Sequence, residues 1–445
     1  AETDLEGNWS AALPAGWSGA VTPDVGPGYA VPDARAVADL QSDTAGLSFR
    51  GVPVRYVRAG AAGSGSGHSW ANALTNLAEA LAEAPDHAEL WVAGGLHKPP
   101  PHSRRTAFIV PPGRRVYGGF GGSETRREQR NWGTNPTILS GDIGTPNDIA
   151  DNCKNVVWGQ AGARLDGFAV TGGHGETEQD MGGGIHEARG FSIPQSADTA
   201  LLVEHCTVSN NRAYYGSSVF GGFLRNTLLV NNHAYQESTT KFSSLECCTL
   251  ANNTSVGFVS GLISQEHRVV NCIFLNNTSF WAPGETNCST SCEWPQSAPL
   301  PIPAGFGNLT AAPLFANATA GDFRLQSDSP CVNVGAAAAW MATATDLDGR
   351  KRVWGAAPDM GAYEYQVSLA PYAIAAALPA TGGFSVTVPT EPGWTYILRY
   401  KNALTDAAWL DFAPPVTLSG SGQAETLTDP DWQSSPQRFY RVDAE

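Results

Sequence analysis

Ionisable side chains gather in one polar, glycine-rich stretch of this sequence, residues 173–187. Carboxylates and histidines placed close together could supply an acid–base pair or bind a cation. Their spacing matches no diagnostic motif, so we favour a solvated acidic loop over an active site. The stretch contains His174, Glu176 and, as the catalytic candidates, Glu178, Asp180, His186 and Glu187.

Two further short patterns suggest a cation site and a cross-link. Asp346 and Asp348, in Asp-Leu-Asp-Gly, have the letters that begin a calcium-binding loop, although the rest of that loop pattern is absent. Calcium is therefore the minor alternative to an ordinary turn, and we expect no other cofactor. Cys288 and Cys292 flank Ser-Thr-Ser in a polar segment and are the best candidates for a disulfide in an oxidising compartment. The sequence has no phosphate loop, dinucleotide fingerprint, nucleophile elbow or zinc motif.

A short segment that ends in two asparagines recurs between residues 201 and 279. The segments are residues 206–211, 227–232, 248–253 and 272–277, and their asparagine pairs begin at intervals of 21, 21 and 24 residues. A fixed period of about twenty residues that carries a strand and a turn is the signature of a β-solenoid. The coils of a solenoid stack about 4.8 Å apart and form parallel sheets along its length.

Alternation within each segment predicts which side chains face the interior. The asparagine pairs fall at a bend, where asparagine tolerates the left-handed backbone conformation and stacked amides can hydrogen-bond from coil to coil. We expect a structural role for them, because each of these coils repeats them. The predicted inward rows are Val203, Leu224, Leu245 and Val269; Cys206, Thr227, Cys248 and Cys272; and Val208, Leu229, Leu250 and Phe274, with Leu165, Phe168 and Val170 in an earlier coil.

The outward positions change in character along the solenoid. Glu204, Arg225 and Glu246 would stack on successive coils as a ladder of opposite charges, each pair contributing about 0.2–1 kcal/mol. Two other rows become apolar towards the later coils and carry no carboxylate, whereas glycosidases need paired carboxylates and lyases need a base. An apolar strip needs a cover: an insertion, the C-terminal domain, residues 1–50 or another subunit. Its candidate binding residues are Leu228, Val230, Ile273 and Leu275.

Changes in composition and pattern divide the chain into three parts. Residues 1–50, with a helix-like piece only at 33–40, are expected to lie extended on the solenoid or on a neighbouring molecule. Residues 51–365 form the solenoid, and an amphipathic helix over residues 69–84 covers its open apolar end. Residues 366–445 alternate in the manner of strands and form a small β-sandwich-like domain.

Family-like motifs run through residues 54–365. They include Val116-Tyr-Gly-Gly-Phe-Gly-Gly-Ser-Glu124-Thr125, Gly182-Gly-Gly-Ile185, Phe274-Leu-Asn-Asn277, Thr345-Asp-Leu-Asp-Gly349 and Asp359-Met-Gly-Ala-Tyr-Glu-Tyr365. They resemble secreted right-handed parallel β-helix proteins related to the polymorphic outer-membrane proteins, with a closing module similar to the choice-of-anchor Q domain. The resemblance implies an all-β protein with a right-handed parallel β-helix, and export. It implies little about activity, because the fold hosts adhesins as well as polysaccharide lyases and glycosidases.

Charge and composition limit the partners. The 49 glycines, 30 prolines and 16% charged residues suit a turn-rich all-β protein. The net charge of −15 argues against nucleic acid, and it disfavours a highly anionic polysaccharide away from a local basic patch. The sequence shows no apolar run long enough for a membrane span and no leader at Ala1, so we expect an exported mature form, secreted or at the cell surface of a bacterial-type cell.

Two classes of function remain open. The first, which we favour, is a non-catalytic surface protein: an adhesin, or a self-assembling surface-layer or filament component. Its partner would be another copy, another surface protein or a cell-surface polysaccharide. The second is a carbohydrate-active enzyme, a lyase or glycosidase, with its site near residues 173–187. Trp281 and Trp294, in an insertion at 280–303, would be sugar-stacking platforms or, more simply, buried anchors of that loop.

Overall fold

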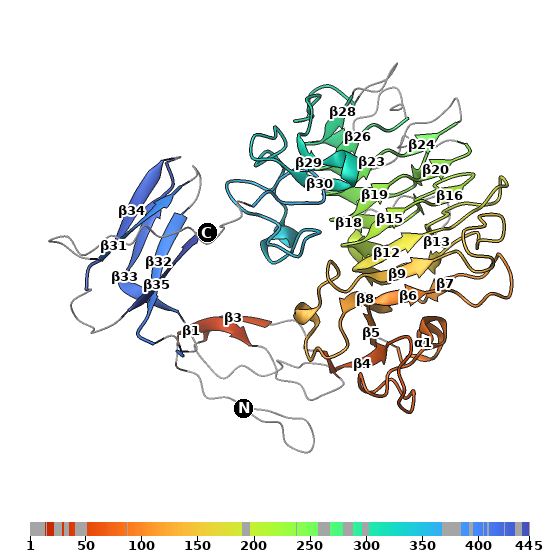
Figure 1. Ribbon diagram of the computed structural model, residues 1–445, viewed down its shortest axis with the longest axis horizontal. Helices are drawn as coiled ribbons and strands as arrows, with labels where there is room; N and C mark the ends of the chain where they lie inside the picture. The colour runs from red at the N-terminus through yellow and green to blue at the C-terminus, as the bar shows by residue number, and fades with distance from the viewer. Residues whose placement is uncertain are drawn as a thin grey trace.

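The computed structural model shows a right-handed parallel β-helix whose coils stack along one axis (Figure 1). The structure describes residues 14, 16–21, 29–30, 35–40, 51–86, 88–188, 196–236, 238–256, 268–278, 288–295, 302–366, 384–390, 395–403, 405–406, 409–421, 423–431 and 438–444.

Four sheets form the walls of the solenoid, named here sheets I to IV, within the described part of the chain. Sheet I contains β2 (Tyr29–Ala30), β4 (Val52–Val57), β5 (Glu89–Ala93), β8 (Arg115–Phe120), β11 (Arg164–Asp166), β14 (Leu202–Glu204), β18 (Phe223–Arg225), β22 (Ser244–Glu246), β25 (Val269–Val270) and β27 (Cys288–Ser289). Sheet II contains β6 (Gly95–His97), β9 (Thr137–Ser140), β12 (Phe168–Thr171), β15 (Thr207–Ser209), β19 (Leu228–Val230), β23 (Thr249–Ala251), β26 (Ile273–Leu275) and β28 (Cys292–Trp294). Sheet III contains β7 (Phe108–Val110), β10 (Val157–Gly159), β13 (Ile185–Glu187), β17 (Val219–Phe220) and β21 (Thr240–Lys241), and sheet IV contains β16 (Arg212–Ala213), β20 (His233–Ala234) and β24 (Thr254–Ser255).

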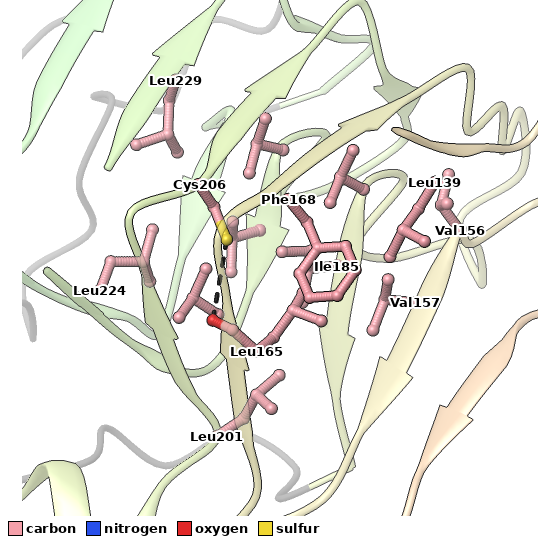
Figure 2. Close-up of a cluster of buried hydrophobic side chains, with 14 of the residues drawn as sticks. Leu139, Val156, Val157, Leu165, Phe168, Ile185, Leu201, Cys206, Leu224 and Leu229 are labelled. Carbon is pink, nitrogen blue, oxygen red and sulfur yellow. Dashed lines mark hydrogen bonds between the residues drawn. The ribbon is translucent and has the colours of Figure 1, made fainter. Parts of the chain in front are cut away.

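The interior of the solenoid is a column of apolar side chains, and the predicted inward rows are confirmed. Val203 is in register with Leu224, and Leu224 with Leu245, and all three are fully buried. Figure 2 shows an earlier part of this column, where the thiol of Cys206 donates to the carbonyl of Leu165 at 3.7 Å. The interior cysteines therefore act as small apolar side chains.

The asparagine pairs form the expected ladder at the bend after sheet II. The first asparagine of each pair has a positive φ, 57° at Asn231, and the second is buried in the first three pairs and half-buried at Asn277. Each buried amide bonds to the next coil: Asn211 Nδ2 donates to Asn232 Oδ1 at 3.1 Å, and Asn232 Nδ2 to Asn253 Oδ1 at 3.0 Å. The first asparagine thus turns the backbone, and the second links neighbouring coils.

Helix α1 (Leu77–Glu83) covers the first coil at one end of the solenoid, and its buried side chains belong to the solenoid core (Figure 1). It is shorter than the helix predicted over residues 69–84. Asn76 begins it by accepting hydrogen bonds from two backbone N–H groups of the first turn. Trp70 lies outside the helix and packs edge-on against Tyr56, with ring centroids 4.8 Å apart.

The apolar strip on sheet II is covered by the chain itself. The segment that follows the last coil, residues 309–365 (the closing segment), runs back over the strip and contains β29 (Phe315–Asn317) and β30 (Asp322–Leu325). Leu228, Ile273 and Leu275 are buried in one cluster with Phe323 and Met360, and Val230 packs beside them. An interface with another molecule, which the sequence left open for these four residues, is therefore excluded for Leu228, Ile273 and Leu275, because their surface is already desolvated, whereas Val230 is half-buried.

The predicted disulfide between Cys288 and Cys292 is wrong. Both cysteines are free and buried. Cys288 lies in sheet I and belongs to the interior cluster, whereas Cys292 lies in sheet II and belongs to the outer cluster beneath the closing segment. The two side chains are on opposite sides of the solenoid wall, so the four-residue spacing from Cys288 to Cys292 does not bring them together.

The two ends of the chain form separate small elements. β1 (Trp17–Val21) pairs antiparallel with β3 (Arg35–Leu40), so the helix expected at 33–40 is a strand instead. Towards the C-terminus, β31 (Phe384–Pro389) pairs with β34 (Ala424–Asp429), and β32 (Thr395–Lys401) lies between β33 (Leu410–Ser419) and β35 (Phe439–Ala444). Both of these sheets contribute to one core, as a sandwich does.

Removing one amide from the asparagine ladder should destabilise the protein strongly. Asn232→Ala removes the acceptor of the buried backbone N–H of Asn211 and the amide that donates to Val208 and Asn253, so we expect the free energy of unfolding to fall by roughly 2–4 kcal/mol in denaturant titration. Asn231→Gly is the matched control, because glycine takes the same positive φ, and its change should be under about 1 kcal/mol. Equal losses in the two variants would contradict the ladder.

All eight cysteines should titrate as thiols once the protein unfolds under non-reducing conditions. In the native protein burial slows their reaction, and it raises the pKa of Cys153 and Cys206 to about 12. Counting thiols with a chromogenic disulfide reagent, before and after adding denaturant, checks both statements. A count of six thiols after unfolding would show that two of the cysteines form a disulfide.

Candidate functional site

The four catalytic candidates from the sequence do not converge on one site. Glu178 is exposed to solvent and His186 is half-buried, whereas Asp180 and Glu187 are buried. Asp180 accepts the ammonium of Lys154 at 2.6 Å and the backbone N–H of Thr177 at 2.9 Å. Burial alone would raise the pKa of Asp180, but these bonds lower it below the usual value. Asp180 thus fixes the loop as an anion.

Glu187 and His186 have structural surroundings. Glu187 accepts the backbone N–H of Leu201 at 3.0 Å and that of Gly222 at 2.7 Å, which joins two neighbouring coils. His186 lies in an outward row of sheet III, stacked on Trp158 with ring centroids 4.1 Å apart. Burial lowers its pKa, so the stacked ring is neutral near pH 7.

The calcium candidates form a turn. Asp346 is buried, and its Oδ1 accepts the backbone N–H groups of Asp348 (3.0 Å) and Arg350 (2.8 Å). Its Oδ2 accepts the N–H of Glu364 at 2.8 Å. Hydrogen-bond donors therefore occupy the directions that a cation would need, and Asp348 is exposed.

Asp166, Glu204 and His205 are the group of metal-ligand side chains that lie within reach of one ion among the described residues. Cations already surround them, because Arg130 contacts Asp166 at 2.8 Å and Arg164 contacts Glu204. The predicted ladder continues this network, with Arg225 Nε 2.8 Å from Glu246 Oε2. A metal ion would have to displace these guanidinium groups, so the arrangement is a buried ion network.

His205 uses both ring nitrogens to fasten the closing segment to the solenoid. Nδ1 is 2.9 Å from Asp166 Oδ1, and Nε2 is 2.9 Å from the carbonyl of Thr345. Both partners are acceptors, which calls for a doubly protonated ring. Burial lowers the pKa of His205, but the charge of Asp166 and the bond to it outweigh burial and raise the pKa above its usual value. Trp132 stacks on the ring, with centroids 4.8 Å apart.

A different group of residues forms the most chemically equipped surface, the outward face of sheet IV beside the 173–187 insertion. His174 pairs with Arg212 across a β-bridge, and Arg212 is in register with His233. This surface, called the sheet IV face below, carries His174, Glu176, Arg212, Tyr214, His233 and Tyr235. Arg212 is exposed and has no carboxylate partner within the described part of the chain.

His174 is buried and its hydrogen bonds fix its tautomer. Nδ1 is 2.5 Å from the carbonyl of Ile149, which can only accept, so Nδ1 carries the proton. Nε2, the nitrogen left to accept a hydrogen bond when the ring carries one proton, lies 2.9 Å from the hydroxyl of Tyr235. Glu176 Oε1 lies 3.4 Å from the same Nε2 and can stabilise a proton received there. The three residues form a potential proton relay.

The sequence pointed to part of this face and missed the rest. His174 and Glu176 were in the candidate stretch, but Tyr235 and Arg212 come from later coils. The signal was their place just after the asparagine pairs: Arg212 follows Asn211 directly, and Tyr235 lies two residues after His233, which is in register with Arg212. Trp294 is 41% exposed, so it is no buried loop anchor, and Trp281 lies outside the described residues.

Comparison with known proteins adds little. No family model matches the chain, and neither does any curated protein. A solved structure with some likeness is pectate lyase Pel9A, at 13% identity and a TM-score of 0.31, covering 70% of this chain and 96% of that one. A likeness this weak carries no argument about function. Within the described residues, no helix has the length and apolar character needed to cross a membrane.

The bond between His205 and Asp166 should make stability depend on pH. Because the folded pKa of His205 is raised, its contribution is present below about pH 6.5 and is lost as the pH rises through the folded value. His205→Asn keeps a residue type that the next coil uses at the same corner, and it should flatten this decline. Denaturant titrations between about pH 5 and pH 9 measure how the free energy of unfolding changes with pH. The exposed His68→Asn should retain the wild-type slope.

Proposed function

We propose that this protein is a secreted or cell-surface β-helix protein that binds a polysaccharide and acts in adhesion. The observation that carries the proposal is the sheet IV face, which presents tyrosine, histidine and arginine side chains in register on successive coils. Aromatic rings and fixed hydrogen-bond donors are the groups that hold sugars in protein sites. A face that repeats from coil to coil suits a long, repeating ligand.

Self-assembly, the other role expected for a non-catalytic protein, loses one of the observations on which it rested. The apolar strip that called for a second copy is buried under the closing segment. A glycosidase is also disfavoured, because Asp180 and Glu187 are held by backbone N–H groups and do not face one another across a groove in the described residues. Polysaccharide binding is therefore the function we favour, because the sheet IV face is a surface that supports it.

The proposal is tested by affinity electrophoresis against gels that contain neutral or uronate-bearing polysaccharides. The wild-type protein should be retarded by at least one polymer. His233→Ala removes one ring from the sheet IV face and should weaken retardation about tenfold in apparent Kd, as expected for a contact of roughly 1.4 kcal/mol.

The matched control is Leu410→Ala, which removes an exposed side chain from the C-terminal sandwich and should bind as the wild type does. Circular dichroism and the unfolding midpoint confirm that both variants are folded. Failure of the wild-type protein to bind any polymer, or equal weakening in both variants, would refute the proposal.

A further inference from the structure

The geometry points to a catalytic step at the sheet IV face: we propose that Tyr235 abstracts the proton α to the carboxylate of a uronate residue and that the bound polysaccharide is cleaved by β-elimination. This inference rests on the proposed polysaccharide binding and adds a reaction to it. Its basis is the pairing of a half-buried tyrosine with a buried histidine of fixed tautomer, held 61 residues away in the sequence.

The hydrogen bonds assign the roles. His174 Nδ1 is occupied by the carbonyl of Ile149, so Nε2 is the basic atom, and it faces the hydroxyl of Tyr235. As the phenolic proton moves to Nε2, the phenolate oxygen becomes a base strong enough for a carbon acid. Glu176, 3.4 Å from Nε2, stabilises the imidazolium that results. Tyr235 is the catalytic base and His174 a positioning and proton-holding residue.

The step balances without a co-reactant. The C5–H bond of the uronate breaks, its proton goes to Tyr235, and its electron pair forms a double bond between C4 and C5. The C4–O4 bond breaks and leaves its electron pair on O4, which takes up the proton held by the tyrosine–histidine pair. The products are a new chain end that carries a hydroxyl and one that carries an unsaturated uronate.

Charge restricts the substrate class. Arg212 lies on the strand between the strands of His174 and Tyr235, is exposed, and makes no ion pair among the described residues, so it can neutralise one uronate carboxylate. Arg104 is 3.7 Å from Glu176 and is therefore already paired. An arginine without an ion pair among the described residues, beside this tyrosine–histidine pair in a protein of net charge −15, suits a polysaccharide whose uronates are spaced among neutral sugars.

The test uses the full chain with gellan, in which neutral sugars separate the uronates, and with polygalacturonate as a densely charged comparison. Ultraviolet absorbance of the unsaturated uronate measures turnover, and affinity electrophoresis measures binding in the same samples. Tyr235→Phe should lower kcat at least about a hundredfold and leave binding intact. Tyr29→Phe, an exposed tyrosine of β2 outside the sheet IV face, is the matched control and should keep wild-type turnover.

His174→Gln tests the relay through a readout that a structural role would not move. The charged groups that face the pair are Glu176, Arg104, Arg212 and His233. The variant should lower kcat while leaving the retardation by gellan unchanged, whereas a merely structural role would weaken binding as well. Binding of gellan without turnover would overturn this inference and leave the proposed function standing, whereas absent binding would overturn both. Turnover that persists in Tyr235→Phe would remove Tyr235 as the base.

Discussion

The structure depends on one backbone constraint, which is that every coil must turn the corner between sheets I and II without breaking the hydrogen bonds to its neighbours. One residue per coil does so with a positive φ, and the row runs through Gly167, His205, Asn226, Cys247, Asn271 and Thr290. This conformation costs about 1–2 kcal/mol for a residue with a side chain, so the corner must be supported by its surroundings. It also aims a row of side chains out of the wall.

The closing segment attaches to that row. Asn226 donates to the carbonyl of Thr345 at 2.8 Å, and Asn271 both donates to and accepts from the backbone of Ala336 at 2.8 Å. Together with the bond from His205, these bonds pair polar backbone groups of the closing segment. Without them, these groups would be covered by apolar side chains and left without a hydrogen-bond partner. The corner and the strip on sheet II therefore work together, because the first fixes the position of the segment and the second contributes the apolar burial.

The fold could be predicted from the sequence because its signals are local and repeated. The period of the asparagine pairs, the inward rows and the charge ladder follow from alternation within one coil. The cover of the strip could not be predicted, because nothing in Leu228 or Ile273 says which distant segment buries them. The disulfide failed for a related reason: Cys288 and Cys292 are close in sequence, but the corner between them places them on opposite sides of the wall.

The sheet IV face shows why the candidate stretch alone was an incomplete guide to chemistry. Acidic residues in an insertion are natural catalytic candidates, but the carboxylates of Asp180 and Glu187 accept hydrogen bonds from backbone N–H groups. These bonds cannot be read from the sequence. The proposed reaction needs a basic atom next to a group that can lose a proton. Here those two are His174 Nε2 and the hydroxyl of Tyr235, which come from different coils. Tyr235 reaches His174 because the stacked strands bring different coils together: His233, two residues before Tyr235, is in register with Arg212, and Arg212 pairs with His174. In a solenoid, the residues to examine for function are therefore those at or near the same step of stacked coils, whatever their distance along the chain.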